Sequence, residues 1–325
     1  MCSKNNSSPS IIREGFIETI SFSVPLFFRP SFIYRKGTDS ILSFQWQPNE
    51  SAAQALTYFF LQNQEAISIP ASPFGSIYGN EECTTEILTD FVADIKRSLI
   101  QKGIQSIVIK HYPACYAPAL HDMVVQAFTN NGFEIIGTEH NQYLPLNASS
   151  KKKVFDHSKL HLIKKCKEAN FTVSVTSSFD ADTWYDIITR ARELRGHPMT
   201  IDLENLRVLN KGNESAYHFF EVKDGSKIIA CAIGVQVTEE VLYYYLAADE
   251  DEYRSYSPMT FLLDRMYDFA CEKNIKVLDM GISSSKGILN EGLRWFKKSF
   301  GALEQPKLVL QYQVGSEEKE VANGK

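Results

Sequence analysis

The sequence predicts a mixed α/β fold, in which helices cover a mixed sheet, and it divides this fold into two lobes. Segments with strand character alternate with segments of helical period along most of the chain. The 325 residues are about twice the length of a typical single domain. The hydrophobic share of 44% and the charged share of 22% are those of an ordinary globular protein, and they exclude a disordered, collagen-like or coiled-coil chain.

The first half of the chain predicts strands and helices in turn. We expect a loose arm at residues 1–15 and a β-rich segment at 16–44, where β-branched and aromatic residues are broken by Pro25, Pro30 and Gly37. The elements expected next are a helix at 51–64, a strand at 66–71, a helix at 84–102 that ends before Gly103, a strand at 106–110, a helix at 118–131 and a strand at 133–144.

A polar, lysine-rich stretch at 145–153 marks the expected domain boundary. It separates a first lobe at 1–150 from a second lobe at 151–314, with a flexible tail at 315–325. The second lobe predicts a basic helix at 158–169, a strand at 171–176, helices at 181–194 and 202–210, and a meander of strands at 217–223, 227–237 and 241–248. A helix at 258–273, a strand at 276–280, a helix at 289–300 and a strand at 307–314 complete it.

Charge and cysteine usage narrow the class of protein. The net charge of -5 and the isoelectric point of about 5.9 lack the basic excess of a DNA-binding protein. The six cysteines are scattered without paired spacing, which is typical of buried thiols in a reducing compartment. The first ten residues are polar, and the longest apolar runs are too short to cross a bilayer. We therefore expect a cytoplasmic protein with no membrane insertion.

Two segments near the end of the second lobe carry a family signature. Residues 278–286 read Leu-Asp-Met-Gly-Ile-Ser-Ser-Ser-Lys, and residues 289–301 read Leu-Asn-Glu-Gly-Leu-Arg-Trp-Phe-Lys-Lys-Ser-Phe-Gly. Together they resemble the Fem-type (FemAB/FemX-like) branch of the GNAT acyltransferase superfamily, which has a strand ending in Asp-x-Gly, a Ser/Gly loop, and a helix reading Gly-Leu-x-x-Phe-Lys-x-x-Phe-Gly. The matching positions are Gly292, Leu293, Phe296, Lys297, Phe300 and Gly301. Residues 68–75 are similar to an early strand-and-turn motif of the same family.

This resemblance implies two tandem GNAT-like lobes, the second more typical than the first, and an N-acyltransferase. The expected reaction moves an acyl group from an acyl-CoA thioester, with acetyl-CoA as the expected donor, to a small-molecule or peptide amine. A second hypothesis keeps the fold and takes aminoacyl-tRNA as donor and a peptidoglycan precursor as acceptor. A third is a catalytically silent pair of lobes that binds a ligand or partner.

The chemistry of acyl transfer selects candidate catalytic residues. Attack of an amine on a thioester or ester creates a tetrahedral oxyanion, which needs fixed hydrogen-bond donors. In a GNAT sheet, the resemblance implies that the strands at 241–248 and 276–280 splay apart around the carrier. Lys297 would then stabilise the oxyanion, while Asp279, at a strand end, or Tyr245 would handle protons. Alternation predicts that Tyr243, Tyr245 and Ala247 share one face.

Carrier contacts are expected at the amides near Ala247, at the loop serines Ser283 and Ser284, and before the helix at 258–273. Acetyl-CoA users commonly carry a glycine-rich loop at this last place, and residues 254–259 here, Arg-Ser-Tyr-Ser-Pro-Met, have neither glycine. Ser257 as N-cap, with Pro258 after it, and Arg254 leave a helix N-terminus that attracts phosphate.

Residues 151–167 contain seven lysines and one acidic residue, Asp156. This segment is either a surface for tRNA or the solvated face of a linker helix. His157 and His161 are spaced for a metal, but no third ligand is near them, so we expect no metal site.

Substrate contacts are expected at Tyr78 and His111 of the first lobe and at Arg195, after the first helix of the second lobe. The sequence contains no P-loop, no dinucleotide fingerprint and no nucleophile elbow.

Overall fold

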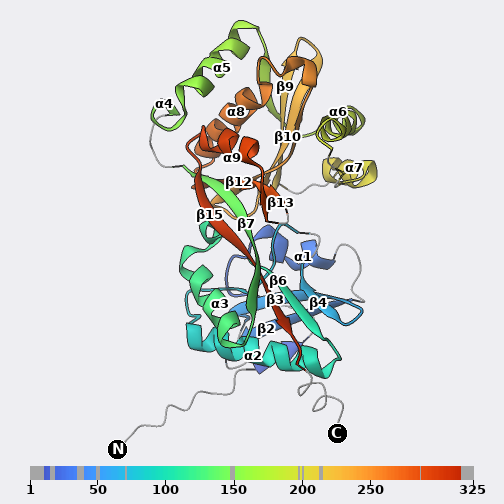
Figure 1. Cartoon of the computed structure of the whole chain (residues 1–325), viewed down its shortest axis with the longest axis vertical. Coiled ribbons are helices and arrows are strands. Elements are labelled where there is room, and N and C mark those ends of the chain that lie inside the picture. The colour runs from blue at the N-terminus through green and yellow to red at the C-terminus, as the bar shows by residue number, and fades with distance from the viewer. Residues whose placement is uncertain are drawn as a thin grey trace, which may run out of the picture. The chain divides into compact units, whose positions relative to one another are not determined.

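A computed structural model describes residues 11–14, 19–34, 40–48, 52–69, 72–146, 151–196, 198–199, 201–211, 215–285 and 287–315 (Figure 1). The chain forms two compact units that are not its two halves. The first takes its residues from Met1–His140, Ser284–Ile288 and Gln305–Lys325, and the second from Asn141–Ser283 and Leu289–Glu304. The expected boundary at residue 150 lies outside the described residues, and so does the expected tail at 315–325 except for Gly315.

The first unit contains a sheet with the strand order β1, β2, β3, β4, β6, β15 and β7, and β5 pairs with β3. The pairing is antiparallel from β1 to β4, parallel between β4 and β6, and antiparallel between β6 and β15. The strands are β1 (Ile11–Glu14), β2 (Ile41–Gln47), β3 (Ala55–Gln62), β4 (Glu65–Ser68), β5 (Tyr78–Gly79), β6 (Ser106–Lys110), β7 (Glu134–Pro145) and β15 (Leu303–Gln313).

The helices of the first unit are α1 (Pro30–Ile33), α2 (Thr85–Gln101) and α3 (Pro118–Asn130), with short 3-10 turns η1 (Leu26–Phe28) and η4 (Ala114–Tyr116). Helix α2 begins where the hydroxyl of Thr84 accepts from the amide of Ile87, and it ends before Gly103, whose φ is +83°. The helices predicted at 84–102 and 118–131 are therefore confirmed.

Two predictions for the first unit are wrong. Residues 51–64, expected as a helix, contain strand β3. The sequence hides this strand because Ala55 to Phe59 are all buried, so the alternation of apolar and polar residues that marks a strand is missing. Within 16–44, expected to be β-rich, the chain instead forms η1 and α1 before β2 begins at Ile41. Pro30 occupies the first turn of α1, where its missing N–H costs nothing.

The second unit contains a sheet with the strand order β7, β12, β11, β10, β9 and β8, in which β7 takes part through Asn141 to Pro145. Neighbours are antiparallel except β11 and β12, which are parallel. The remaining bounds are β8 (Thr172–Thr176), β9 (Tyr217–Asp224), β10 (Lys227–Gln236), β11 (Val241–Asp249) and β12 (Val277–Ile282). Short strands β13 (Ser284–Ser285) and β14 (Ile288–Leu289) pair with each other.

Helices cover both faces of this sheet (Figure 1). They are α4 (Lys151–Val154), α5 (His157–Glu168), α6 (Ala181–Glu193), α7 (Leu203–Lys211), α8 (Pro258–Glu272) and α9 (Glu291–Lys298), with a 3-10 turn η5 (Asp251–Tyr253). Successive residues of β9 point to opposite layers: Phe219 packs on Trp184 of α6, and Phe220 packs on Phe269 of α8. The element order predicted for the second lobe is confirmed.

Candidate functional site

Strands β11 and β12 part from each other partway along their length. Their parallel ladder ends with Tyr243 opposite Asp279. Beyond this pair, β11 continues beside β10 to Asp249, and β12 continues beside β7 to Ile282. Where two parallel strands separate, the backbone N–H and C=O groups that face each other lose their partners across the ladder. A ligand in the opening can form hydrogen bonds with these groups.

Strand β11 contains a β-bulge shortly after Tyr243. Ala232 of β10 pairs with Ala247 and the next residue, Ile233, pairs with Tyr245, so Leu246 is the extra residue, and its φ is +40°. The predicted common face of Tyr243, Tyr245 and Ala247 is therefore wrong, because Ala247 packs against the hydrophobic cluster that contains Leu242.

Lys297 lies buried at the end of α9, with 2% of the residue exposed. Its Nζ donates to the carbonyl oxygen of Gly281 at 2.9 Å and to that of Ile282 at 2.7 Å. Burial lowers the pKa of Lys297 to about 7, and the charge of Asp279 opposes this shift. The ammonium thus holds two carbonyl groups of β12 just past the point where the strands part.

Asp279 is buried on β12, and its carboxylate is part of a small network. Oδ1 accepts from Nδ2 of Asn141 at 2.9 Å and from the amide of Gly281 at 2.9 Å. The carboxylate therefore shapes the irregularity of β12 at Gly281, and Asn141 of β7 fixes the orientation of the carboxylate.

Tyr243 lies closer to this network than Tyr245, the tyrosine selected from the sequence. Its ring packs on Gly281, where a Cβ would lie 3.2 Å from Cε2 of Tyr243. Burial, together with the charges of Asp279 and Tyr245, raises the pKa of Tyr243, so its hydroxyl stays protonated. The rings of Tyr243 and Tyr245 lie 6.0 Å apart. Burial also raises the pKa of Tyr245.

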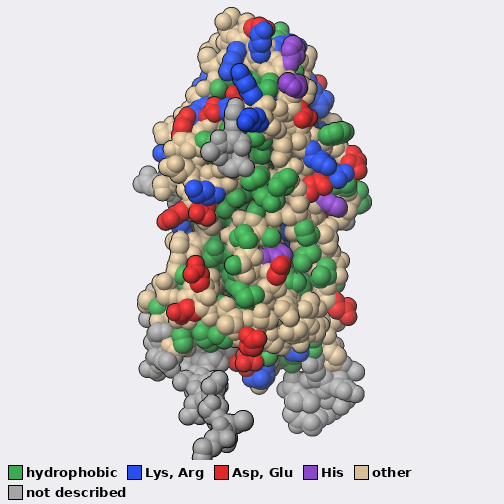
Figure 2. Space-filling model, turned by 90° about the vertical axis from the view of Figure 1, so that its left-hand side faces the viewer, with side chains coloured by type: hydrophobic (Ala, Val, Ile, Leu, Met, Phe, Trp, Pro, Cys, Tyr) green, Lys and Arg blue, Asp and Glu red, His purple; other side chains and the backbone are tan. Residues whose placement is uncertain are grey.

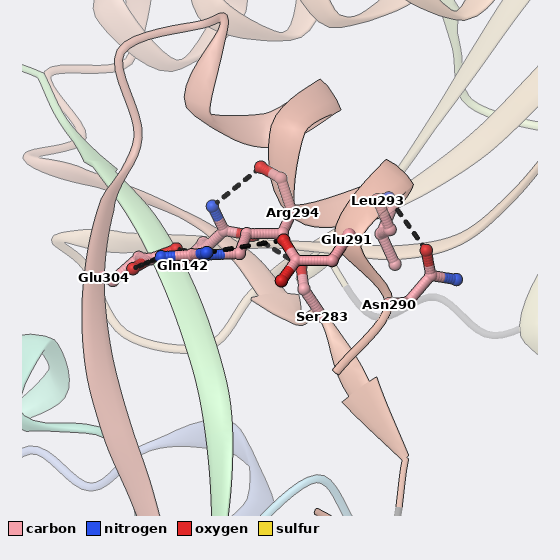
Figure 3. Close-up of polar contacts among 7 residues, drawn as sticks. All are labelled: Gln142, Ser283, Asn290, Glu291, Leu293, Arg294 and Glu304. Carbon is pink, nitrogen blue, oxygen red and sulfur yellow. Dashed lines mark hydrogen bonds and ion pairs between the residues drawn. The ribbon is translucent and has the colours of Figure 1, made fainter. Parts of the chain in front are cut away.

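A polar network near the start of α9 holds Ser283 (Figure 3). Its hydroxyl donates to Oε1 of Gln142, a side chain with no exposed surface. Nε2 of Gln142 donates to the carbonyl oxygen of Arg294 at 3.1 Å. Asn290 caps α9, since its Oδ1 accepts from the amide of Leu293 at 3.0 Å. The predicted carrier contact Ser283 therefore has its hydroxyl engaged within the second unit.

Ser284 belongs to the first unit and is engaged there as well. Its hydroxyl donates to Oε2 of Glu139 and accepts from the amide of His140 at 2.8 Å. Asn141 and Gln142, which position Asp279 and Ser283, were not among the residues selected from the sequence. The signal that could have found them is the run of polar residues at 139–142 inside a predicted strand.

Most backbone amides of the segment before α8 donate to carbonyl groups of the protein itself. The amides of Tyr253, Arg254, Tyr256, Ser257 and Thr260 each donate to a protein carbonyl group. Ser257 is the N-cap residue of α8, as predicted, but its φ is +54° and its hydroxyl pairs with that of Thr260 at 2.8 Å. The guanidinium of Arg254 pairs with Asp251 at 3.0 Å.

Arg195, a predicted substrate contact, pairs with Asp249 at the end of β11 at 2.9 Å. The neighbouring pair, Arg190 with Glu250, joins α6 to the same strand end at 2.6 Å. The two pairs fix the end of α6 against the far end of β11.

Much of the basic segment at 151–167 is engaged within the second unit. Nζ of Lys151 lies 2.6 Å from Asp264, Lys159 lies over the ring of Phe296, and Lys165 donates to a backbone carbonyl group. Figure 2 shows Lys and Arg side chains gathered where α4 and α5 lie. The exposed lysines that no other described residue engages are Lys152, Lys153 and Lys167.

The two substrate contacts predicted in the first unit, His111 and Tyr78, differ from each other in burial. His111 is fully buried, its Nδ1 lies 2.9 Å from Oγ of Ser76, and burial holds its pKa well below the usual range. It is therefore a neutral interior residue. Tyr78 is half-buried, stacks on Phe22 at 6.2 Å and lines a surface pocket.

Within the described ranges, no group of three or more His, Cys, Asp and Glu side chains is arranged to hold a metal ion. None of the described helices has the length and apolar character needed to span a membrane.

Comparison with known proteins agrees with this fold. Residues 159–291 match the family model of the acetyltransferase (GNAT) domain. The structure of FemX superposes with a TM-score of 0.63 at 12% identity, over 86% of this chain and 89% of that one. No curated protein sequence matches the chain.

Two further structures show the same fold. The C-terminal domain of a putative lysylphosphatidylglycerol synthetase from Agrobacterium fabrum has a TM-score of 0.57 at 13% identity, over 82% of this chain and 84% of that one. L-PGS from Bacillus licheniformis has a TM-score of 0.56 at 14% identity, over 83% and 86%. Residues 159–291 therefore match a GNAT acetyltransferase domain, and the chain as a whole has the same two-lobe fold as FemX.

Proposed function

We propose that this protein is an acyltransferase that moves an acyl group from an activated carrier to an amine. The observation that carries the proposal is the parting of β11 and β12 at Tyr243 and Asp279, with the charge of Lys297 held directly behind the opening. Backbone donors, a cation and a protonated hydroxyl are the groups that a tetrahedral oxyanion requires, and β11, Lys297 and Tyr243 would supply them.

In the proposed reaction, the amine attacks the carbonyl carbon of the carrier ester or thioester directly. The oxyanion accepts hydrogen bonds from β11 amides near Ala247, and the positive charge of Lys297 lowers the energy of the negative charge that develops. Tyr243 donates a proton to the leaving oxygen or sulfur as the bond from that atom to the carbonyl carbon breaks, and its phenolate takes up the proton that the attacking nitrogen gives off. Asp279 keeps the backbone at Gly281 in place. We assign Lys297 as a residue that positions β12 and supplies charge.

The segment before α8 bears on the identity of the donor. Coenzyme A is usually held by free amides at this place in a GNAT domain, and here those of Arg254, Tyr256 and Ser257 donate to protein carbonyl groups. This favours the second hypothesis, an aminoacyl-tRNA ester, over acyl-CoA. The exposed Lys152, Lys153 and Lys167 would meet the tRNA phosphates, and a peptidoglycan precursor stays the alternative acceptor.

A donor comparison tests the proposal. Purified protein is incubated with an amine mixture and either acetyl-CoA or aminoacyl-tRNA, and acylated amine is measured by mass spectrometry. We expect product from aminoacyl-tRNA and a strong loss in Tyr243→Phe, while the matched control Tyr185→Phe on α6 keeps full turnover. Product from acetyl-CoA alone would reverse the choice of donor, and no product from either would contradict acyl transfer.

We place this reaction in the cytoplasm. The cysteines that the structure describes, Cys83, Cys115, Cys166, Cys231 and Cys271, are all free, and free thiols are typical of reducing compartments.

A further inference from the structure

Two histidine side chains pack against each other in the interior of the first unit. His111 comes directly after β6, and His121 lies near the start of α3. Their ring centroids are 4.6 Å apart, His111 is fully buried, and 6% of His121 is exposed. The proposed acyl transfer uses neither ring. Histidine is the side chain whose charge ordinarily changes near neutral pH, so a buried pair makes this part of the fold sensitive to pH.

Each ring has one nitrogen engaged and one without a partner. Nδ1 of His111 lies 2.9 Å from Oγ of the buried Ser76, and Nδ1 of His121 lies 2.8 Å from Oδ1 of Asp122. Nε2 of both rings is buried, and neither has a hydrogen-bond partner in the part of the chain that the structure describes. Because a carboxylate accepts, Nδ1 of a neutral His121 carries the proton, and its buried Nε2 is the unprotonated nitrogen.

The titratable groups packed on His111 from its own segment and from β5 are neutral at physiological pH. The ring of Tyr112 lies 4.2 Å from that of His111, and burial raises the pKa of Tyr112 well above its usual value. Tyr78 packs on Tyr112 from β5 with ring centroids 5.8 Å apart. Cys83 also faces Tyr112, and burial raises the pKa of its thiol to about 11. These groups give a charged imidazole no counter-ion.

The charged groups near the pair lie at its edge. Asp122 is bonded to His121, and 95% of the Asp122 side chain is exposed. On β15, which pairs with the backbone of His111, the ammonium of Lys307 donates to the carbonyl oxygen of Pro73 and supplies no negative charge. Burial, together with the charge that His121 can carry, holds the pKa of His111 well below its usual range. The closed arrangement therefore favours two neutral rings.

The start of α3 depends on this packing more than its end does. Ala117 occupies the N-cap position and offers no side-chain cap. At the other end, Nδ2 of Asn131 donates to the carbonyl oxygen of Thr89 on α2 at 2.9 Å. Ser76, which bonds His111, has a φ of +101°, a conformation that a residue other than glycine keeps only when its surroundings hold it. A disturbance of the pair would therefore release the start of α3 and the segment at Ser76 first.

We propose that His111 and His121 form an acid-sensitive latch, which holds the start of α3 to the sheet of the first unit at neutral pH and releases it in acid. A proton on Nε2 of His121 makes an imidazolium against the ring of His111, and its new N–H has no acceptor there. In the open form water binds these N–H groups, and each ring can carry a charge. Because the open form takes up protons that the closed form does not, opening increases as the pH falls below about 6.5, the ordinary pKa of histidine.

Hydrogen–deuterium exchange of the full chain tests the latch. Exchange is followed by mass spectrometry at about pH 7.5, 6.5 and 5.5, with rates corrected for the intrinsic effect of pH. We expect peptides at 111–124 to lose protection by about tenfold per pH unit below about pH 6.5 for each ring that takes up a proton. Peptides at 217–236 of the second unit are the internal reference and should keep their protection. No loss at 111–124, or an equal loss in both units, would overturn the inference.

Two variants separate the latch from a general effect of acid. His111→Phe/His121→Phe keeps two packed rings and removes both titrations, so exchange at 111–124 should no longer change with pH. The matched control His157→Gln/His161→Gln removes two exposed histidines of α5 and should keep the wild-type response. A double Phe variant that still opens in acid would contradict the latch. If that variant does not fold, His121→Gln should reduce the response to that of one ring, and an unchanged response would contradict the latch as well.

The latch is independent of the proposed acyl transfer, because exchange is measured without donor or acceptor. A protein that transfers no acyl group can still open in acid, and an active enzyme can lack the response. Each result therefore bears on one proposal only.

Discussion

The ammonium of Lys297 and the carbonyl oxygen of Gly281 are joined by a 2.9 Å hydrogen bond inside a region closed to solvent. The bond links the last turn of α9 to the end of β12, and the carbonyl oxygen of Ile282 shares the same ammonium. A buried cation that donates to neutral carbonyl groups keeps its charge only at a cost in free energy. Such a cost is retained where the charge serves the reaction or fixes a strand end.

Replacing Lys297 with Met should reduce kcat by about 100-fold, the scale for losing one oxyanion-stabilising group. The same variant should change the pH dependence of stability. Because the pKa of Lys297 is lowered from 10.5 to about 7, between these values the unfolded chain binds a proton that the folded chain does not. The wild type therefore loses stability as the pH falls through that window, and Lys297→Met loses less. Urea unfolding of the wild type and of Lys297→Met across this pH range measures the two stability profiles, with Lys298→Met, at an exposed lysine, as control. The acylation assay measures kcat.

Replacing Gly281 with Ala should destabilise the second unit by about 2–4 kcal/mol, since a positive φ and a steric clash act together. Its φ is +73°, and the new Cβ would lie 3.2 Å from the ring of Tyr243. Gly225→Ala is the matched control, because its φ is +56° and open space surrounds it. It should cost about 1–2 kcal/mol. Equal losses in denaturant unfolding would show that Tyr243 does not restrict Gly281.

Replacing Ser283 with Ala should cost about 1–3 kcal/mol, because Oε1 of the buried Gln142 loses its hydrogen-bond donor. The network also orients the start of α9, so activity should fall as well (Figure 3). Ser285→Ala, at an exposed serine, should change the free energy of unfolding by less than about 0.5 kcal/mol. If Ser283→Ala matches this control, the network does not stabilise the fold.

Changing Lys152, Lys153 and Lys167 to Glu should abolish most tRNA binding and flatten its salt dependence, since these side chains are free to meet phosphates. Lys151→Gln should instead lower stability, because its Nζ lies 2.6 Å from Asp264. Filter binding at several salt concentrations and thermal unfolding separate the two effects. Unchanged RNA affinity in the triple variant would remove the support that these lysines give to a tRNA donor.

The sequence predicts the second unit well because hydrophobic residues recur at the spacing of a helix or of a strand in most of its elements. Helix α8 and the meander of β9, β10 and β11 follow from hydrophobic spacing and the turn at Gly225. Strand β3 does not follow, since both of its faces are buried and the sequence Ala-Leu-Thr-Tyr-Phe shows no alternation. An apolar run of this kind suits a helix and a strand equally.

The candidate site is predictable only in part. Lys297 and Asp279 follow from a motif, and the structure brings them together around Gly281. The side of the sheet to which Ala247 points does not follow from the sequence, because the bulge at Leu246 leaves no mark in the residue pattern. Asn141 acts on Asp279 from a strand more than a hundred residues earlier in the chain, and such long-range pairing is set by topology.

Strand β15 has a consequence for how the chain is made. In the first unit it lies between β6 and β7, yet it comes last in the sequence among the described strands. A ribosome therefore releases β6 and β7 long before the strand that joins them exists. During synthesis the facing edges of these two strands stay unpaired, and such edges bind other chains readily. The first unit can complete its sheet only after β15 has been made, so a premature stop near residue 300 would damage the part of the protein that was made first.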